Sequence, residues 1–501
     1  MSHPVKRRGS CIVSIDIGTS SAKGMLCSIE GTIVAQERAS YACHYPKPDR
    51  VEQDADEVLA AVVDVVRRLV KRAGLATPSA VEAIVFGGIW QSLLPLDAEG
   101  RPLCKALTWA DQRSAKENDL LRARLDNEEV RARTGCALHP MYSLSKILWF
   151  KTQAPELYRQ TARFVSIKEY ILSQLYGTRV VDRSIASGTG VWNIERRDWD
   201  YELLGYAGVG EARFSECVEP LSMVRGLKPC YAAAMGLREG TPAVVGAADG
   251  AFAHLGAVGL AEGRLSLSAG TSIALRMRLA EPRTVRGSEA WCYYLADGSW
   301  LQGAVAHDGG NTLRWFADNV LGARLADETV FDHVNELARS ASPGASGLCF
   351  FPLFGGERCP HYRPDARGAI VGLSFNHGAV ELARALYEGL AFCIRALYRM
   401  LAGETSPDVV VTGGILKAPV WLEIVADCLG KPLLRPAIDE SAAWGGVVLG
   451  LTAVGAYPDL AAASASLVSV AGAVEPSPAR EAAYQMIMRE YEKLYARLYV
   501  D

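Results

Sequence analysis

The sequence predicts an α/β protein made of two similar halves, each with a mixed sheet flanked by helices. In each half, short apolar runs typical of strands precede an amphipathic segment typical of a helix, and a buried strand follows that helix. A motif also repeats: residues 13–23 read VSIDIGTSSAK and residues 265–275 read LSLSAGTSIAL. We therefore expect two related domains, residues 1–245 and 246–501, gripping one polyphosphate between them.

The first half begins with strands and continues with a helix. Three strands are expected at residues 12–17, 24–29 and 32–37, and the last two form a hairpin. A helix is predicted over residues 54–72, with Asp54 or Asp56 as its cap. Its buried face is formed by Val58, Val62, Val65 and Leu69. A buried strand over residues 83–86 then ends at two glycines.

The second half repeats this plan. Strands are expected at residues 243–245, 265–268, 273–277, 300–304 and 409–411. Long helices are expected at residues 381–401, 442–455 and 478–500. The inner face of the last helix is predicted to consist of Met486, Ile487, Tyr491, Leu494, Tyr495 and Leu498. No low-complexity linker separates the halves, so we expect them to abut and hinge.

The composition excludes several classes of protein. The chain has 501 residues, of which 50% are apolar and 22% charged, with a formal net charge of -3. Nothing in that balance favours nucleic acid or an anionic membrane surface. No apolar run approaches the roughly 20 residues needed to cross a bilayer. We expect a cytoplasmic protein. The sequence also lacks the Walker loop, the G-x-S-x-G elbow and the H-E-x-x-H zinc motif.

Both copies of the repeated motif contain a Gly-Thr-Ser turn between two strands. Such a turn offers backbone N–H groups and hydroxyls to phosphate. The candidate ligands are Gly18, Thr19, Ser20 and Lys23 at the first turn, and Gly270, Thr271 and Ser272 at the second. Asp16 lies where a strand meets the first turn, and a carboxylate beside phosphate requires a cation. Asp16 is therefore a candidate Mg²⁺ ligand; the alternative is a turn-capping role.

Asp249 follows a short strand within the sequence Gly-Ala-Ala-Asp-Gly, and no Lys or Arg neighbours it in the sequence. The small residues on both sides leave room for a substrate. A carboxylate there is suited to act as a general base that takes a proton from an attacking hydroxyl. The alternative is an ordinary turn aspartate before Gly250.

Two further glycine pairs follow predicted elements of the second half. Gly413 and Gly414, with Lys417 after them, form a strand-to-helix turn that would let the backbone approach a nucleotide. The pair at residues 445–446 either lines the same pocket or permits close helix packing, and we favour packing.

An aromatic and polar group of residues in the first half is typical of sugar binding. An indole stacks on the C–H face of a sugar, while bidentate polar groups meet its hydroxyls. The candidates are Trp90, Gln91, Trp109, Asp111, Arg113 and His139. The alternatives are that each Trp is a core residue and that His139 is a structural hydrogen-bonding group.

Three ordered motifs resemble the FGGY carbohydrate kinases, members of the actin, Hsp70 and hexokinase-like ATPase group, over about residues 12–453. The first is DIGTS at Asp16. The second is MYSLSKILWFKTQ at residues 141–153, which resembles the family's first signature. The third combines GAIVGL at residues 368–373 with ALYE at residues 385–388, and resembles the second signature.

This resemblance implies two ribonuclease H-like (actin-like ATPase) domains with mixed five-stranded sheets and an interdomain cleft. The sugar would bind mainly the first domain and ATP mainly the second, with Mg²⁺ as the metal. Gly309, Gly310 and Asn311 would complete the nucleotide pocket, and Asp249 would be the catalytic base. The resemblance alone suggests a homodimer.

Within the family, several stretches look most like gluconate kinases, with xylulokinases next. The sequence departs from both at residues 90–91, where Trp-Gln replaces Met-His, and at residues 307–308, where His-Asp stands and an Asn is expected. A glutamine cannot be cationic, so the carboxylate of a sugar acid would need Arg113 or Arg183 instead.

The expected function is transfer of the γ-phosphoryl group of Mg-ATP to a hydroxyl of a small sugar or sugar acid. D-gluconate, giving 6-phosphogluconate, is the first expectation. The alternatives are xylulose or another pentulose or polyol. A hypothesis from a different functional class is that the protein is a non-catalytic, actin-like sensor of sugar or nucleotide.

Overall fold

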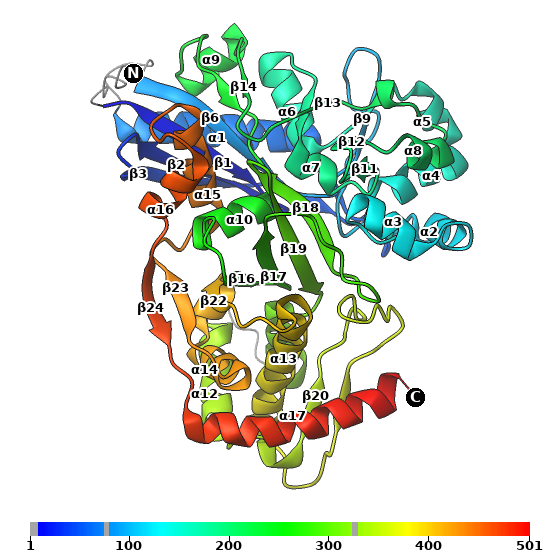
Figure 1. The fold of residues 1–501 in the computed structure, drawn as a ribbon, viewed down its shortest axis with the longest axis vertical. Coiled ribbons are helices and arrows are strands. Elements are labelled where there is room, and N and C mark those ends of the chain that lie inside the picture. The colour runs from blue at the N-terminus through cyan, green and yellow to red at the C-terminus, as the bar shows by residue number, and fades with distance from the viewer. Residues whose placement is uncertain (1–8, 75–79, 323–328, 501) are drawn as a thin grey trace.

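The computed structural model describes residues 9–74, 80–322 and 329–500, and it has the expected α/β architecture (Figure 1). Among these residues, the first main sheet has six strands in the order β14-β15-β6-β1-β2-β3. They are β1 (Cys11–Ile17), β2 (Ser21–Ser28), β3 (Ile33–Ser40), β6 (Val81–Gly88), β14 (Met223–Val224) and β15 (Ala243–Val244). Strand β1 pairs antiparallel with β2 and parallel with β6, so the sheet is mixed as predicted.

Alternation of side chains along β1 places two helices on opposite faces of this sheet. Helix α1 (Ala55–Ala73) covers one face, and Asp54 caps it as predicted by accepting hydrogen bonds from two backbone N–H groups. Helix α15 (Ser441–Ala453) covers the other face, where a Cβ on Gly450 would lie 2.9 Å from the Ile12 side chain. A helix from the end of the chain therefore completes the first sheet.

The second main sheet has seven strands among the described residues, in the order β18-β19-β17-β16-β22-β23-β24. They are β16 (Arg264–Ala269), β17 (Ile273–Leu279), β18 (Trp291–Ala296), β19 (Ser299–Ala306), β22 (Asp408–Thr412), β23 (Leu433–Pro436) and β24 (Val470–Val474). Both sheets are wider than the five strands expected. The additional strands lie at or near edges, where runs such as the two-residue β14 are too short to carry a periodic pattern.

The remaining described helices form the cover of the sheets and a large insertion in the first half. They are α2 (Ala115–Arg122), α3 (Asn127–Thr134), α4 (Ser143–Gln153), α5 (Pro155–Gln160), α6 (Ile167–Tyr176), α7 (Arg183–Ser187), α8 (Tyr201–Ala207), α9 (Pro229–Met235), α10 (Asp249–Ala257), α11 (Gly310–Trp315), α12 (Val330–Ser340), α13 (Ala379–Ala402), α14 (Pro419–Leu429), α16 (Leu460–Leu467) and α17 (Pro478–Tyr499). The minor strands are β4 (Cys43–His44), β5 (Glu52–Gln53), β7 (Leu94–Leu96), β8 (Ala106–Leu107), β9 (Arg163–Val165), β10 (Val180–Asp182), β11 (Trp192–Asn193), β12 (Asp198–Trp199), β13 (Glu216–Val218), β20 (Cys349–Phe351) and β21 (Ala369–Val371).

The closing helix α17 has the predicted bounds, but the predicted inner face is partly wrong. Met486 is 68% exposed and Leu498 is 46% exposed, whereas Tyr484 and Met488 are buried with Tyr491. The buried stripe is fixed by tertiary contacts, because the Tyr484 hydroxyl accepts a hydrogen bond from Arg384 on α13 and donates one to Glu388. Apolar residues lie around much of α17, so the pattern alone did not select the correct stripe.

Two helices cross closely where the two halves of the chain meet (Figure 1). A Cβ on Gly256 of α10 would lie 1.8 Å from the Ser441 carbonyl oxygen at the start of α15. A Cβ on Gly445 of α15 would lie 1.9 Å from the Phe252 carbonyl oxygen. The packing role favoured for the glycine pair at residues 445–446 is therefore confirmed, and this crossing sets the position of α10.

The long β18–β19 hairpin also joins the two halves, reaching from the second sheet into the upper part of the molecule (Figure 1). On β18, the Cys292 N–H donates to the Gly135 carbonyl at 2.9 Å, and the Tyr294 N–H donates to the Ser187 hydroxyl at 2.8 Å.

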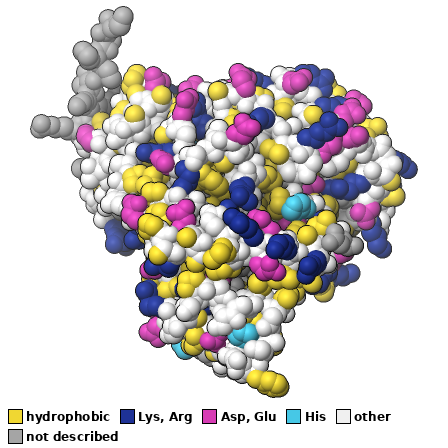
Figure 2. All heavy atoms as spheres, turned by 60° about the horizontal axis from the view of Figure 1, so that its bottom comes forward, with side chains coloured by type: hydrophobic (Ala, Val, Ile, Leu, Met, Phe, Trp, Pro, Cys, Tyr) yellow, Lys and Arg dark blue, Asp and Glu magenta, His cyan; other side chains and the backbone are white. Residues whose placement is uncertain are grey.

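The face in Figure 2 carries interspersed basic, acidic and apolar side chains. Within the described residues, no helix has both the length and the apolar character needed to span a membrane.

Candidate active site

Asp16 and Asp249 lie together where β1 and β6 end. Asp16 is opposite Gly87 of β6 in the parallel ladder, and the next residue of β6 bridges to Ala248, which directly precedes Asp249. A Cβ on Gly87 would lie 2.6 Å from the Phe252 ring, so this glycine lets α10 approach the sheet. Strand ends and a helix start thus bring two carboxylates from distant parts of the sequence to one place.

The environment disfavours simultaneous ionisation of these two carboxyl groups. Burial raises the pKa of Asp16 to about 7, and the nearby carboxylate of Asp249 adds to the increase. The Oδ1 atom of Asp16 is buried and has no hydrogen-bond partner among the described residues. A buried carboxylate oxygen without a donor is suited to a cation.

The pKa of Asp249 is also raised, chiefly by burial. Its Oδ1 accepts a hydrogen bond of 2.7 Å from the Gly250 N–H, and the neighbouring Arg276 opposes the increase. The fold therefore supplies cations that the neighbouring sequence lacks: Arg276 from β17 and Lys168 from α6. Lys168 is already paired with Asp182 at 2.5 Å, so Arg276 is the cation near Asp249 without its own ion-pair partner among the described residues.

Side-chain donors form hydrogen bonds to the backbone carbonyls of the first Gly-Thr-Ser turn. The Gly18 carbonyl accepts a hydrogen bond of 2.6 Å from the Tyr41 hydroxyl, and the Thr19 carbonyl accepts one of 2.6 Å from Gln53. Ser20 is exposed, so its hydroxyl is accessible. Lys23, the third residue of β2, pairs with Glu440 at 2.7 Å across the two halves of the chain.

The second turn lies against two of the other predicted nucleotide segments. The Gly310 N–H donates to the Gly270 carbonyl at 2.6 Å, and a Cβ on Gly309 would lie 3.0 Å from the Thr271 carbonyl oxygen. Gly413 has φ +89 and faces the Ala269 carbonyl, to which a Cβ would approach within 2.8 Å. The structure thus brings residues 270–272, 309–310 and 413 together.

The other two predicted nucleotide residues follow Gly413 on the same segment. Gly414 begins and Lys417 ends the short η5 turn (Gly414–Lys417), and the Lys417 side chain is exposed. The Lys417 carbonyl accepts a hydrogen bond of 3.4 Å from Asn335. These residues lie on the β22 side of the second turn.

Trp90 and Gln91 form part of an aromatic wall shared by the two halves. The Trp90 ring lies 5.0 Å from the Tyr293 ring and 5.3 Å from the Trp291 ring, both on β18. Gln91 donates a hydrogen bond of 3.2 Å to the Tyr293 hydroxyl, which lies 2.7 Å from the Tyr142 hydroxyl. The indole N–H of Trp90 donates to the Ser184 carbonyl, so its orientation is fixed.

Asp111 and Arg113 are brought together with each other but not with Trp90. Arg113 donates to Asp111 at 2.7 Å and to Glu52 at 2.5 Å, and Asp111 also accepts a hydrogen bond from the Val51 N–H. The expected alternative cation, Arg183, is paired with Glu219. Both arginines considered for a sugar carboxylate are therefore paired with protein carboxylates.

His139 lines a cavity of 580 Å³ formed by residues from both halves. The other lining residues include Trp109, His307, Asp308, Asn311, Phe354 and Arg358. Burial and the nearby Arg358 lower the pKa of His139 well below its usual range, and its Nδ1 accepts a hydrogen bond from the Met141 N–H. His139 is therefore a neutral contact in this cavity.

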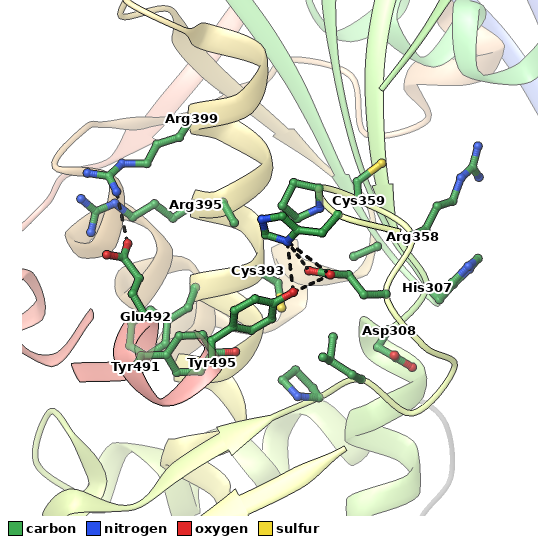
Figure 3. Close-up of a pocket in the computed structure, with 18 of the residues that line it drawn as sticks. His307, Asp308, Arg358, Cys359, Cys393, Arg395, Arg399, Tyr491, Glu492 and Tyr495 are labelled. Atoms are coloured by element: carbon green, nitrogen blue, oxygen red, sulfur yellow. Dashed lines mark hydrogen bonds and ion pairs between the residues drawn. The ribbon is translucent and has the colours of Figure 1, made fainter. Parts of the chain in front are cut away.

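A neighbouring cavity of 280 Å³ lies beside α13 and α17 (Figure 3). Its lining residues are engaged with one another, since Tyr495 donates to Glu357 at 2.5 Å and the exposed Arg399 pairs with Glu492 at 3.2 Å. The side chains of His307 and Arg358 project away from these two pairs (Figure 3). Both residues also line the cavity that contains His139.

Several residues of the site were not identified from the sequence. Arg276 is one basic residue in an otherwise strand-like run, and Arg358 belongs to no motif or periodic pattern described above. The signal available for Tyr293 was the aromatic run at residues 291–294. Among the described residues, no group of three or more His, Cys, Asp or Glu side chains is arranged to hold a metal ion.

Comparisons with known proteins agree across nearly the whole chain. Residues 11–256 match the N-terminal domain of the FGGY family of carbohydrate kinases, and residues 265–454 match its C-terminal domain. The gluconokinase of Bacillus subtilis (strain 168) is 32% identical over 454 residues, which cover 89% of this chain and 88% of that protein.

Two solved structures are similar over 98% of both chains. The gluconate kinase of Lactobacillus acidophilus has a TM-score of 0.91 at 28% identity. The ligand-bound xylulose kinase of the same organism has a TM-score of 0.91 at 27% identity. The fold therefore does not separate the two substrates that these names contain.

Proposed function

The chain belongs to the FGGY family of carbohydrate kinases, and from this membership we propose that its acceptor is D-gluconate, which it converts to 6-phosphogluconate. The chain is an ATP-dependent sugar kinase. The observation that carries the mechanism is the pair of buried carboxylates, Asp16 and Asp249, at the junction of the two halves.

Asp249 is the proposed catalytic base. It would accept the proton of the attacking hydroxyl, while the phosphoryl group moves from ATP to the acceptor oxygen. A base must be ionised to act, and burial works against that state. Hydrogen bonding from the Gly250 N–H and the charge of Arg276 favour the carboxylate form, so these neighbours support the assignment.

Asp16 is the proposed protein ligand for Mg²⁺. The buried and partnerless Oδ1 of Asp16 fits this role, and Mg²⁺ commonly takes one or two protein carboxylates together with waters and phosphate oxygens. The ion would neutralise charge on the phosphates, while Asp16 would hold it on the β1 side of the junction.

The two Gly-Thr-Ser turns are the proposed phosphate ligands. Exposed hydroxyls at Ser20 and Thr271 support this, as does the approach of Gly309 and Gly310 to the second turn. Gly413, Gly414 and Lys417 extend the same region and would contact the nucleotide. Closure of the two halves over the acceptor would exclude water and suppress hydrolysis of ATP.

The acceptor is proposed to bind between the aromatic wall at Trp90, Gln91 and Tyr293 and the cavity at His139. Asp111 and Arg113 are left out of this site because they are paired with each other. Xylulose is the second candidate acceptor, since a xylulose kinase is as similar in structure as a gluconate kinase.

The test of the base is Asp249→Asn. A positioned general base contributes roughly 10²–10⁴-fold to the rate, so we expect kcat to fall by that factor, or about 3–5 kcal/mol of barrier. Gluconate binding, measured by calorimetry, should survive. Asp408→Asn, at the exposed start of β22, is the matched control and should leave kcat unchanged. Near-normal turnover in Asp249→Asn would remove Asp249 from the mechanism.

The acceptor is tested by coupled ADP release with gluconate, xylulose, ribulose, erythritol and glycerol. The highest kcat/KM is expected with gluconate. ADP release without sugar should be far slower. Equal rates with and without every sugar would argue for the sensor-like alternative.

A further inference from the structure

Arg276 is a charged side chain without an adequate protein partner. Its Nε and Nη1 atoms are closed off from solvent, and neither has a hydrogen-bond acceptor among the described residues. No described carboxylate lies within 4.0 Å of its guanidinium. Burying a charged group is strongly unfavourable unless the group is paired. A guanidinium in this state would be stabilised by an anion, and the described part of the protein supplies none.

The guanidinium lies beside the start of α10, where the proposed base is located. A Cβ on Gly250 would stand 3.0 Å from Arg276 Nε and 2.2 Å from the Trp90 ring. Arg276 therefore packs beside Trp90 and the Asp249–Gly250 segment. Asp249 attracts it at longer range but does not pair with it.

The phosphate-binding role proposed for the second turn does not account for this charge. Arg276 lies on β17 beyond the second turn, and the extended chain from Thr271 to Arg276 spans about 16 Å at roughly 3.3 Å per residue. An arginine side chain does not reach back over that length to the turn. Its guanidinium lies instead beside Gly250 and Trp90, on the side of the site where the acceptor is proposed to bind.

The other arginines considered for an acceptor carboxylate are in different states. Arg113 and Arg183 are paired with carboxylates. Arg358 lines the cavity near His139, but Glu289 attracts it and two phenolic hydroxyls, of Tyr142 and Tyr293, lie nearby. Arg276 has two solvent-inaccessible guanidinium nitrogens with no acceptor in the described part of the chain. Arg183 has one such nitrogen, its Nε, but its guanidinium is paired with Glu219.

We infer that Arg276 binds the carboxylate of the acceptor and makes the enzyme selective for sugar acids of the aldonate class. The guanidinium offers paired N–H donors that match the two oxygens of a carboxylate. The terminal hydroxyl of the same molecule then faces Asp249. This inference rests on the proposed function and assigns the cationic partner that Gln91 cannot provide.

The experiment compares Arg276→Leu, Arg276→Lys and the matched control Arg358→Leu. Each is assayed with D-gluconate and with two neutral acceptors, D-glucitol and D-xylulose. Arg276→Leu should raise KM for gluconate by at least 100-fold, while kcat/KM for the better neutral acceptor changes less than about fivefold. Arg276→Lys keeps the charge without the planar fork and should fall between Arg276→Leu and the wild type. Arg358→Leu should change all three acceptors to a similar degree.

Folding is checked by thermal unfolding, because Arg276→Leu removes an unpaired buried charge and should leave Tm unchanged or raised. Gluconate should raise the Tm of the wild type but not that of Arg276→Leu. An equal loss with acid and neutral acceptors would make Arg276 only a positioning residue for Asp249 and would overturn the inference.

The remaining outcomes separate this inference from the proposed function. A wild type that prefers xylulose to every aldonate would overturn the aldonate assignment and leave the sugar kinase intact. Selective loss of gluconate in Arg358→Leu, but not in Arg276→Leu, would move the carboxylate to Arg358. If no sugar is phosphorylated, the proposed acceptor fails, and calorimetry of gluconate with wild type and Arg276→Leu still decides whether Arg276 binds it.

Discussion

At the scale of single residues, the site depends on two carboxyl groups whose buried environment disfavours the ionised form. Burial raises the pKa of both Asp16 and Asp249, and the neighbouring Asp249 carboxylate adds to the increase at Asp16. Such groups lower the stability of a folded protein at neutral pH, because ionising them costs free energy that the unfolded chain does not lose. Their presence at a junction of two halves is typical of residues selected for chemistry rather than for stability.

Asp16→Asn should therefore stabilise the protein while abolishing its activity. The folded-state pKa of Asp16, about 7, lies above its ordinary value of 3.8, so the folded state loses stability as pH rises toward 7. We expect the variant to be more stable than wild type at pH 8 by roughly 1–4 kcal/mol, with the difference shrinking toward pH 4. Urea unfolding in EDTA measures this.

Two controls accompany that experiment. Mg²⁺ with a nucleotide should stabilise the wild type more than Asp16→Asn, because the asparagine cannot neutralise the ion. Asp111→Asn breaks a buried ion pair and should instead destabilise the protein. An Asp16→Asn protein that is less stable than wild type at pH 8 in EDTA would contradict the proposed strain at this carboxylate.

The residues of the site differ in how far the sequence could reveal them. Asp16, Asp249 and both Gly-Thr-Ser turns belong to local motifs, and the repeat made them visible. The ion pair between Arg113 and Glu52 joins separate segments of the chain, and the lack of an ion-pair partner for Arg276 also depends on the tertiary structure of the described residues. Spacing along the chain carries no information on such contacts, so the sequence did not indicate which arginine lacks a protein partner.

At the scale of elements, periodicity predicted the long segments and missed short or uniformly buried ones. Helices α1 and α13 have their predicted positions because amphipathic spacing and end signals agree. Strand β18 was missed because all six of its residues are buried, which leaves no alternation to detect. That omission mattered, since β18 carries Trp291 and Tyr293 to the aromatic wall.

The crossing of α10 and α15 yields a prediction at this scale. Gly445→Ala would place a methyl group against the Phe252 carbonyl oxygen, so one helix must move. We expect a loss of about 1–3 kcal/mol in the free energy of unfolding. Because Asp249 begins α10, kcat should also fall, by up to about 100-fold for a displacement near 1 Å.

Gly205→Ala in α8 is the matched control for that substitution. A Cβ on Gly205 would meet nothing within 4 Å, and the residue is helical. Replacing a glycine by alanine in such a helix should stabilise it by up to about 1 kcal/mol without changing kcat. Equal effects of the two substitutions on kcat would show that the crossing does not position Asp249.

At the scale of the whole molecule, the two halves are joined by elements that cross from one to the other, and they also line the cavity at His139 together. We propose residues 1–245 and 246–501 as the domains. Two elements nevertheless cross that division, since α15 covers the first sheet and β18 packs on the insertion of the first half. The cavity at His139 is lined from both sides, so a relative motion of the halves would change its volume.

The ion pair between Lys23 and Glu440 yields the last prediction, because it links the halves and occupies a proposed phosphate ligand. Both side chains are partly exposed, so the pair is worth no more than about 1 kcal/mol. If Lys23 binds phosphate, Glu440 competes with the nucleotide for it. Glu440→Gln should then lower KM for ATP by about twofold to fivefold, and Lys23→Met should raise it.

Salt distinguishes this competition from a change in folding. At about 1 M ionic strength the Debye length is only about 3 Å, so the difference between Glu440→Gln and wild type should largely vanish. Glu492→Gln removes a carboxylate from a similarly exposed pair with Arg399, away from both turns, and should leave KM for ATP unchanged. Lys23→Met with an unaltered KM for ATP would exclude Lys23 from the phosphate site and make its pairing with Glu440 purely structural.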